Sequence, residues 1–189
     1  MKAILDAAAV VFAKVGFEAA TMEAIAERAK TSIGSLYQFF PNKLALFEAL
    51  AQRSIERSRA AVDELLDDEV ESGSWRALID ATIDRFASQR EDDPDFRAML
   101  VNFQLYGVYA DADKALHRHT IERVTMMIRR YAPGLAPGQQ WVVATLIVEM
   151  FSALLLHAQR EEPAFARKLM EETKTLLYRY LSPYVERGR

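Results

Sequence analysis

Residues 21–43 read TMEAIAERAKTSIGSLYQFFPNK, and this stretch predicts two short helices joined by a tight turn. Thr21 and Ser32 are N-cap residues, because a hydroxyl oxygen can accept a hydrogen bond from the free backbone N–H groups of a helix start. Each of them directly precedes an apolar-patterned run, over 22–29 and 33–40. Two short helices in this relation are typical of a helix-turn-helix.

The second of these helices has one side for the protein core and one side for a surface. Leu36 and Phe40 lie on one face of the helix and are expected to anchor it. Gly34 lets the helix start approach another surface closely. Ser35 and Gln38 can hydrogen-bond base edges, whereas a tyrosine hydroxyl can reach a phosphate. The residues predicted to face outward are Ile33, Gly34, Ser35, Tyr37 and Gln38.

The same run resembles the signature of the TetR/AcrR family of transcriptional regulators, and the resemblance covers roughly residues 4–50. The Leu-Tyr pair, the aromatic run after it and the Asn-Lys ending stand at the spacing that the family shows. The resemblance implies a regulator with a helix-turn-helix and a nine-helix layout. It implies that Ile33, Gly34, Ser35 and Gln38 face bases and that Thr21, Tyr37, Phe39 and Lys43 lie along the phosphate backbone.

Three residues depart from the family pattern. Phe39 stands where a histidine is common, so one polar contact to the DNA backbone is missing. Lys30 stands where the turn usually has glycine, which costs free energy in a left-handed conformation but adds positive charge near DNA. Glu23 replaces what is often a basic residue, so it would repel phosphate or accept a hydrogen bond from a cytosine amine.

Composition and charge agree with a protein that touches DNA at one end only. The chain carries a net charge of −3, with eight Lys/Arg against six Asp/Glu in residues 1–60, so that part is +2 and the remainder is −5. The absence of cysteine excludes disulfides and thiolate zinc sites. The N-terminus has no long apolar segment, so a signal peptide is not expected and a cytoplasmic location is.

Glycine and proline are scarce, and the remaining apolar periodicity predicts an all-α fold of about nine helices. Residues 1–46 are expected to form a three-helix DNA-binding domain, and 47–189 a helical domain for effector binding and dimerisation. The other predicted helices cover 4–14 with Gly16 as the C-terminal glycine, 43–67 with Asn42 as the cap, 75–90, 95–108, 114–131, 139–159, and 163–181 ended by Pro183.

The last two helices are predicted to form a subunit interface. Residues 141–158 contain one formal charge and would be long enough to approach a membrane span, but Glu149 and several polar residues argue against one. A helix that is apolar all round is otherwise buried on both sides, and the resemblance implies a partner subunit on one side and a ligand on the other. The predicted interface stripe is Phe165, Leu169, Thr173, Leu176 and Tyr180.

A large apolar pocket for a lipophilic effector is expected within the C-terminal part of the chain. For each apolar residue assigned to it, plain hydrophobic core is the simpler interpretation. The candidate ligand-binding residues are Phe86, Met99, Phe103, Tyr106, Met127, Trp141 and Glu149.

Glu149 is the only formal charge between Trp141 and Ala158. A lone ionised carboxylate among apolar residues must be paired, protonated or hydrated. Three interpretations stay open: a hydrogen bond to a neighbouring helix or across the dimer, a place in the ligand cavity that would select cationic effectors, or a groove that reaches solvent.

These observations predict a homodimeric regulator, most simply a repressor, that binds a palindromic double-stranded DNA operator and is released by a small-molecule effector. No catalytic constellation, cofactor motif or metal-ligand spacing is present in the sequence, so no enzyme activity, cofactor, metal or membrane partner is expected. The alternative is a helical ligand-binding or interaction protein of the same family that lacks specific DNA binding, because Phe39 and Glu23 weaken the DNA-facing surface.

Overall fold

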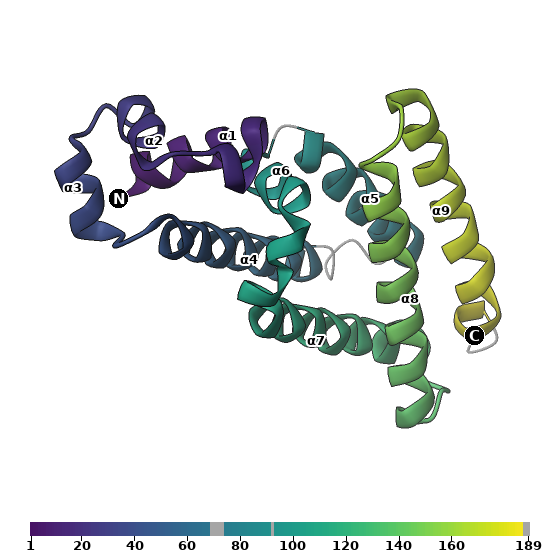
Figure 1. Ribbon diagram of the computed structural model, residues 1–189. Coiled ribbons are helices and arrows are strands. Elements are labelled where there is room, and N and C mark those ends of the chain that lie inside the picture. The colour runs from purple at the N-terminus through teal and green to yellow at the C-terminus, as the bar shows by residue number, and fades with distance from the viewer. Residues whose placement is uncertain (69–73, 92, 187–189) are drawn as a thin grey trace. The chain divides into compact units, whose positions relative to one another are not determined.

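The computed structural model describes residues 1–68, 74–91 and 93–186, and these ranges form α-helices and one short 3-10 helix (Figure 1). The prediction of an all-α fold with nine α-helices is confirmed for the described residues. In chain order, the elements are α1 (Lys2–Ala19), α2 (Met22–Arg28), α3 (Ile33–Phe39), α4 (Lys43–Asp68), α5 (Trp75–Glu91), α6 (Pro94–Val101), η1 (Phe103–Leu105), α7 (Tyr106–Tyr131), α8 (Pro137–Ala158) and α9 (Pro163–Val185).

The described residues group into two compact units. The first unit is built from residues 1–58 and 93–116, and the second from 59–68, 74–91 and 117–186. Helices α4 and α7 each contribute residues to both units. The predicted division into 1–46 and 47–189 is a division by function. The two units are defined by packing alone and do not test it, so it stays a prediction.

An aromatic cluster holds the first unit together. Phe12 of α1 and Phe47 of α4 are fully buried, with their ring centroids 5.5 Å apart in an edge-to-face arrangement. Phe17 lies 5.7 Å from each of these rings. Ala98 and Met99 of α6 complete the same core, so α6 packs with α1 and α4 although it lies far from them in the sequence.

Gly16 and Asn102 fix the end of α1. Gly16 has φ +78° and ψ 167°, a conformation that side chains disfavour, and it kinks the helix where the sequence predicts a C-terminal glycine. The backbone N–H of Phe17, freed by this kink, donates to Oδ1 of Asn102. The Asn102 amide donates in turn to the carbonyls of Phe12 (3.3 Å) and Ala98 (2.7 Å). This fully buried asparagine therefore satisfies groups on both α1 and α6.

The prediction of one helix over 95–108 is wrong, because the chain leaves the helical conformation at Asn102. Helix α6 ends at Val101 and Asn102 leaves the helical conformation, with φ −107° and ψ 36°. Helix α7 then begins at Tyr106, eight residues before the predicted start at 114. The break is caused by the tertiary hydrogen bonds of the Asn102 side chain, which no local pattern in the sequence reveals.

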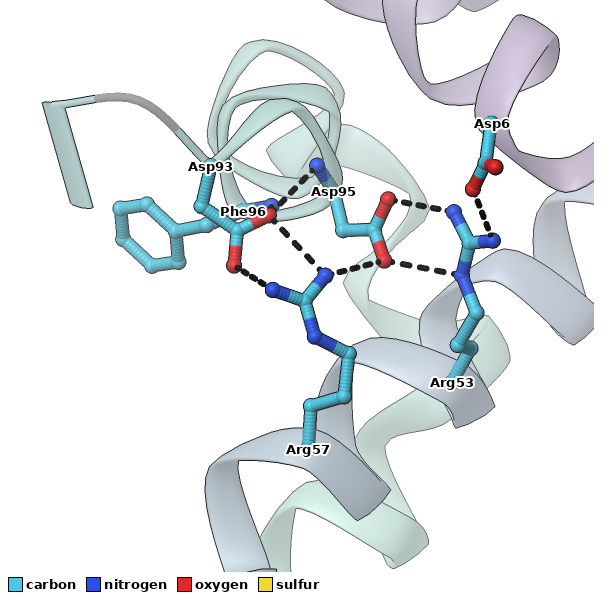
Figure 2. Close-up of polar contacts among 6 residues, drawn as sticks. All are labelled: Asp6, Arg53, Arg57, Asp93, Asp95 and Phe96. Carbon is cyan, nitrogen blue, oxygen red and sulfur yellow. Dashed lines mark hydrogen bonds and ion pairs between the residues drawn. The ribbon is translucent and has the colours of Figure 1, made fainter. Parts of the chain in front are cut away.

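A charged network joins α1, α4 and α6 in the first unit (Figure 2). Asp95, which is 1% exposed, accepts hydrogen bonds from Arg53 (2.6 and 2.9 Å) and from Arg57 (3.0 Å). Arg53 also donates to Asp6 at 2.6 Å, and Arg57 contacts Asp93. Burial acts to lower the pKa of Arg53, but the hydrogen bonds and charges of Asp95 and Asp6 outweigh burial and raise it.

A polar seam pairs α5 with α9 in the second unit. Its residues on α5 recur every four positions, and their partners on α9 and just after its end lie four and eight positions apart, so successive pairs lie on facing sides of two antiparallel helices. Burial favours a lower pKa for Lys174, but its bonds to Asp84 and Glu171 raise the pKa. The pairs are Asp84–Lys174 (2.6 Å), Asp80–Tyr178 and Arg76–Glu186 (3.1 Å).

The prediction that the last helix stops at Leu181, before Pro183, is also wrong. Helix α9 continues to Val185 with Pro183 inside its last turn. A proline lacks one backbone donor, and near a helix end this removes a single hydrogen bond without forcing the chain to leave the helix.

Candidate nucleic-acid interface

Side-chain caps define the starts of the helices in the helix-turn-helix. Thr21 Oγ1 accepts from the backbone N–H of Ala24 at 3.1 Å, and Ser32 Oγ accepts from the backbone N–H of Ser35 at 3.0 Å. Asn42 Oδ1 caps α4 by accepting from the backbone N–H of residue 45 at 2.8 Å. The three predicted N-caps are confirmed, and each satisfies a backbone donor that a helix start leaves free.

The turn between α2 and α3 passes through Lys30. Its φ is +53°, which is the left-handed conformation that the sequence predicts at this position. The backbone N–H of Thr31 reaches back to the carbonyl of Ala26 at 3.0 Å and closes the turn. A lysine rather than a glycine therefore holds the turn, at a conformational cost of about 1 kcal/mol.

Helix α3 has the two faces that the sequence predicts. Leu36 is fully buried and Phe40, just after the helix, is buried in the core of the first unit. Ser35 is half-buried, and its Oγ accepts a hydrogen bond from Ser32 Oγ at 2.8 Å, which leaves the Ser35 proton free to donate to another group. The exposed residues of the helix are Ile33, Gly34, Tyr37, Gln38 and Phe39.

Lys43 has a structural role that sequence reasoning missed. Its ammonium donates to the carbonyls of Glu18 (3.1 Å) and Ala20 (2.8 Å), and it lies 4.6 Å from the centroid of the Phe17 ring. An ammonium has three donors, so one is left for a phosphate. Lys43 therefore ties the start of α4 to the end of α1 in addition to any contact with DNA.

The candidate effector residues are divided between the two units. In the first unit, Met99 is part of the buried core, and Phe103 is exposed and stacks on Tyr106 with centroids 5.7 Å apart. In the second unit, Phe86 and Met127 belong to one apolar cluster. Trp141 is exposed on α8. Of the seven candidates, Phe86 and Met127 are the pair that lies together in one cluster of the second unit.

The structure places Glu149 at an exposed position beside a polar partner, and its assignment to the ligand site stays a prediction. Its side chain is 60% exposed, and Oε1 lies 2.8 Å from Nε2 of His117 on α7. The first of the three interpretations, a hydrogen bond to a neighbouring helix, describes its position.

The stripe predicted for the dimer interface is only partly exposed. Phe165 and Leu176 are 49% and 44% exposed, and Leu169 and Tyr180 are half-buried. Thr173 is 1% exposed and its hydroxyl donates to the carbonyl of Leu169 at 2.7 Å, so its place in the interface is corrected to the packed face of α9.

Helix α8 adds exposed apolar residues that sequence reasoning did not assign to the interface. Val142 and Leu146 stand four residues apart and are both exposed, and α8 lies beside α9 (Figure 1). Their four-residue spacing is the sequence pattern that could have identified them as one exposed face.

Within the described residues, α8 is the one helix long and apolar enough to span a membrane by length and composition, and 28% of its apolar window is buried. That property is also met by a helix that covers its apolar face with protein.

The described residues contain no group of three or more His, Cys, Asp or Glu side chains that could hold a metal ion. The exposed face of α3 therefore offers hydrogen-bonding groups on a helix that Ser32 caps and the buried Leu36 fixes to the core.

Residues 4–50 match the family described as bacterial regulatory proteins, tetR family, and residues 74–181 match the tetracyclin repressor-like C-terminal domain. The chain is 44% identical over 158 residues to the HTH-type transcriptional repressor KstR of Mycolicibacterium smegmatis, a match that covers 82% of this chain and 74% of the relative.

Solved structures share the fold along nearly the whole chain. A TetR-family transcriptional regulator from Streptomyces coelicolor is 31% identical, with a TM-score of 0.64 over 97% of this chain and 98% of the other. The SmeT–triclosan complex is similar with a TM-score of 0.69 over 97% of this chain and 90% of the other, at 22% identity, which shows the fold alone.

Proposed function

We propose, from the premise that the chain belongs to the TetR family of bacterial regulatory proteins, that it binds an inverted-repeat operator as a homodimer and is released by a small apolar effector. Membership makes it a ligand-responsive transcriptional regulator, and its similarity to KstR makes it a repressor. The DNA-binding function is assigned to residues 1–46, and effector binding and dimerisation to 47–189.

The observation that carries the proposal is the geometry of α3. Leu36 locks the helix from behind, and Ser32 fixes its first turn. The outer face then presents Gln38 and the Ser35 hydroxyl as hydrogen-bonding groups, with Tyr37 beside them. A short helix held in this way fits the major groove, where amide and hydroxyl groups read base edges.

The exposed apolar residues of α8 and α9 support the dimer. Val142 and Leu146 on α8, with Phe165 and Leu176 on α9, form exposed apolar surface on two adjacent helices. Large apolar surface exposed on helices is characteristic of protein–protein contact. Two copies related by a two-fold axis would cover this surface with its own counterpart, and they would present two α3 helices to an inverted repeat.

The match of residues 74–181 to the tetracyclin repressor-like C-terminal domain supports an effector site in that part of the chain. SmeT, which shares the fold, is recorded in complex with triclosan, a small molecule. The apolar clusters of the second unit favour an effector that is mainly apolar, because burial of such a molecule gains free energy in proportion to the apolar area removed from water.

A second function stays in competition: a ligand-binding protein of this family without specific DNA binding. Glu23 is exposed in the first turn of α2, and Phe39 is exposed at the end of α3, where polar or basic groups would serve DNA better. These two residues weaken phosphate contacts but leave the outer face of α3 intact.

Selection from random DNA separates the two functions. The full chain is incubated with a pool of random-sequence duplexes, and the bound fraction is recovered, amplified and bound again at a fixed salt concentration. Specific binding predicts progressive enrichment of one sequence, because specific affinities exceed non-specific ones by roughly 10³-fold or more. A pool that stays random after repeated rounds would favour the ligand-binding protein without DNA recognition.

A further inference from the structure

The turn that joins α2 to α3 contains a strained lysine (Figure 1). Lys30, with φ +53°, is the one residue other than glycine in the described ranges whose φ is positive. Its backbone N–H donates to the carbonyl of Glu27 at 3.1 Å, and that of Thr31 donates to the carbonyl of Ala26 at 3.0 Å. This pair of bonds closes a helix end around a left-handed residue, for which glycine is usual because it has no Cβ. A lysine at this position therefore lowers the stability of the turn.

The Lys30 side chain gains nothing within the described residues that offsets this loss of stability. It is exposed, and its ammonium takes part in no hydrogen bond, ion pair or aromatic contact there. Lys43 differs, because its ammonium donates to the carbonyls of Glu18 and Ala20. The Lys30 ammonium is thus free to meet an anion outside its own chain.

The helix that follows the turn has no charge of its own. Residues 33–39 read IGSLYQF, so α3 itself offers neither a lysine nor an arginine to a phosphate. Over residues 21–43, three basic side chains stand against two acidic ones, and without Lys30 this stretch would be neutral. Because DNA binding depends on cations that neutralise backbone phosphates, the cations that accompany α3 must come from its flanks.

We propose that Lys30 binds a backbone phosphate at the edge of the half-site that α3 of the same subunit reads. The proposal rests on the operator binding proposed above and adds a phosphate-binding residue outside α3. The major groove is about 12 Å wide, so a long side chain on the turn that enters the helix reaches one of the two backbones that border the groove. The turn is less stable in the free protein, and in exchange the protein binds DNA of any sequence more tightly.

Three substitutions of Lys30 separate charge from strain. Lys30→Gln removes the charge and keeps the strain, Lys30→Arg keeps both, and Lys30→Gly removes both. Lys114→Gln is the matched control, because Lys114 is an exposed lysine of α7 whose ammonium lies 3.4 Å from Asp111. Dissociation constants are measured by fluorescence anisotropy over a range of salt concentrations, for the enriched duplex and for an unrelated duplex of the same length. Melting temperatures are measured by circular dichroism.

Lys30→Gln is expected to weaken binding to both duplexes roughly tenfold or more near 0.1 M salt. The slope of log Kd against log salt should become shallower by about two, because each subunit of the dimer loses one phosphate contact. Lys30→Arg should bind as the unmodified chain does. Lys30→Gly should lose as much affinity as Lys30→Gln and yet melt about 2–4 °C above the unmodified chain, since the strain is gone. A residue with a structural role alone would not change stability and affinity in opposite directions.

Unchanged affinity and salt dependence in Lys30→Gln would overturn the proposal. An equal loss in Lys30→Arg would also overturn it, because charge would then not be the cause, and an equal loss in Lys114→Gln would show an effect of net charge rather than of position. A Lys30→Gly variant that melts below the unmodified chain would contradict the exchange of stability for affinity. If selection enriches no duplex, operator recognition fails by itself, and the unrelated duplex still tests the phosphate contact.

Discussion

Gln38 lies on the exposed side of α3, close in sequence to the fully buried Leu36. Replacement by alanine should relax base preference at one operator position, at a cost of about 1–3 kcal/mol for the preferred base, because the side-chain amide is lost while the helix keeps its anchor. Quantitative binding to a set of duplexes that vary at each position measures this. Gln52→Ala is the control, since Gln52 lies on α4 and bonds Glu56. Unchanged preference at every position would remove Gln38 from the recognition surface.

Tyr109 reports on the first unit through its ionisation. Burial first, and then the charges of Asp113 and Tyr106, raise its pKa from 10.0 to about 12. A pKa that is higher in the folded than in the unfolded chain favours the protonated phenol, so this stabilisation is present below pH 10 and is lost as pH rises through about 12. Chemical unfolding at several alkaline pH values should show a shallower loss of stability between these limits in Tyr109→Phe than in the unmodified chain. Parallel curves would contradict the assignment.

Single residues also show what the sequence does and does not reveal. Thr21, Ser32 and Asn42 were predictable as caps because a cap acts on backbone groups within three residues of itself. Lys43 is predictable as a phosphate contact from its charge at a helix start and from the resemblance, whereas its bonds to the carbonyls at the end of α1 depend on how two helices meet.

At the scale of elements, α6 is held to α4 and α1 by buried charge as well as by apolar packing (Figure 2). Asp95→Ala should destabilise the first unit by about 3 kcal/mol, because it leaves Arg53 without its buried partner. Asp6→Ala removes the exposed partner of the same arginine and should cost about 1 kcal/mol or less. Urea unfolding followed by circular dichroism measures both. Equal losses in the two variants would show that burial of Asp95 does not decide the strength of this network.

Element boundaries were predictable where the cause is local and unpredictable where it is tertiary. The helix-turn-helix, the Gly16 kink and the start of α4 follow from caps and conformational preferences within a few residues. The end of α6 at Val101 follows from hydrogen bonds between Asn102 and residues of α1 more than eighty positions earlier. Pro183 predicts a helix end that the structure does not have, because a proline close to the end of a helix does not force the helix to stop.

At the scale of the whole molecule, the exposed apolar residues of α8 and α9 need a partner. Leu176→Glu should place an unpaired carboxylate in the dimer interface and weaken it by about 3 kcal/mol, or roughly a hundredfold in the dimer dissociation constant. Sedimentation velocity over a range of concentrations measures this. Val101→Glu is the control, because it makes the same change on a similarly exposed residue of α6. An intact Leu176→Glu dimer would move the interface away from this face of α9.

The proposed dimer interface and effector site are the least predictable from the sequence. The stripe on the last helix included Thr173 because helical spacing alone cannot tell which apolar face meets its own chain and which meets another. Large apolar side chains, with Glu149, are the basis for the candidate effector residues, and the structure divides these residues between two units. Glu149 was expected among apolar groups, but its neighbour His117 lies on another helix and was outside the reach of the local pattern.

In the proposed complex, two copies of the chain read two inverted half-sites through their α3 helices, spaced about one DNA turn, or roughly 34–36 Å, apart. The most direct measurement compares the affinity of the full chain for the enriched duplex with its affinity for a duplex in which one half-site is replaced by unrelated sequence, at the same salt concentration. We expect the affinity to fall about a hundredfold or more, because the second α3 then makes only sequence-independent contacts. Equal affinity for the two duplexes would contradict it.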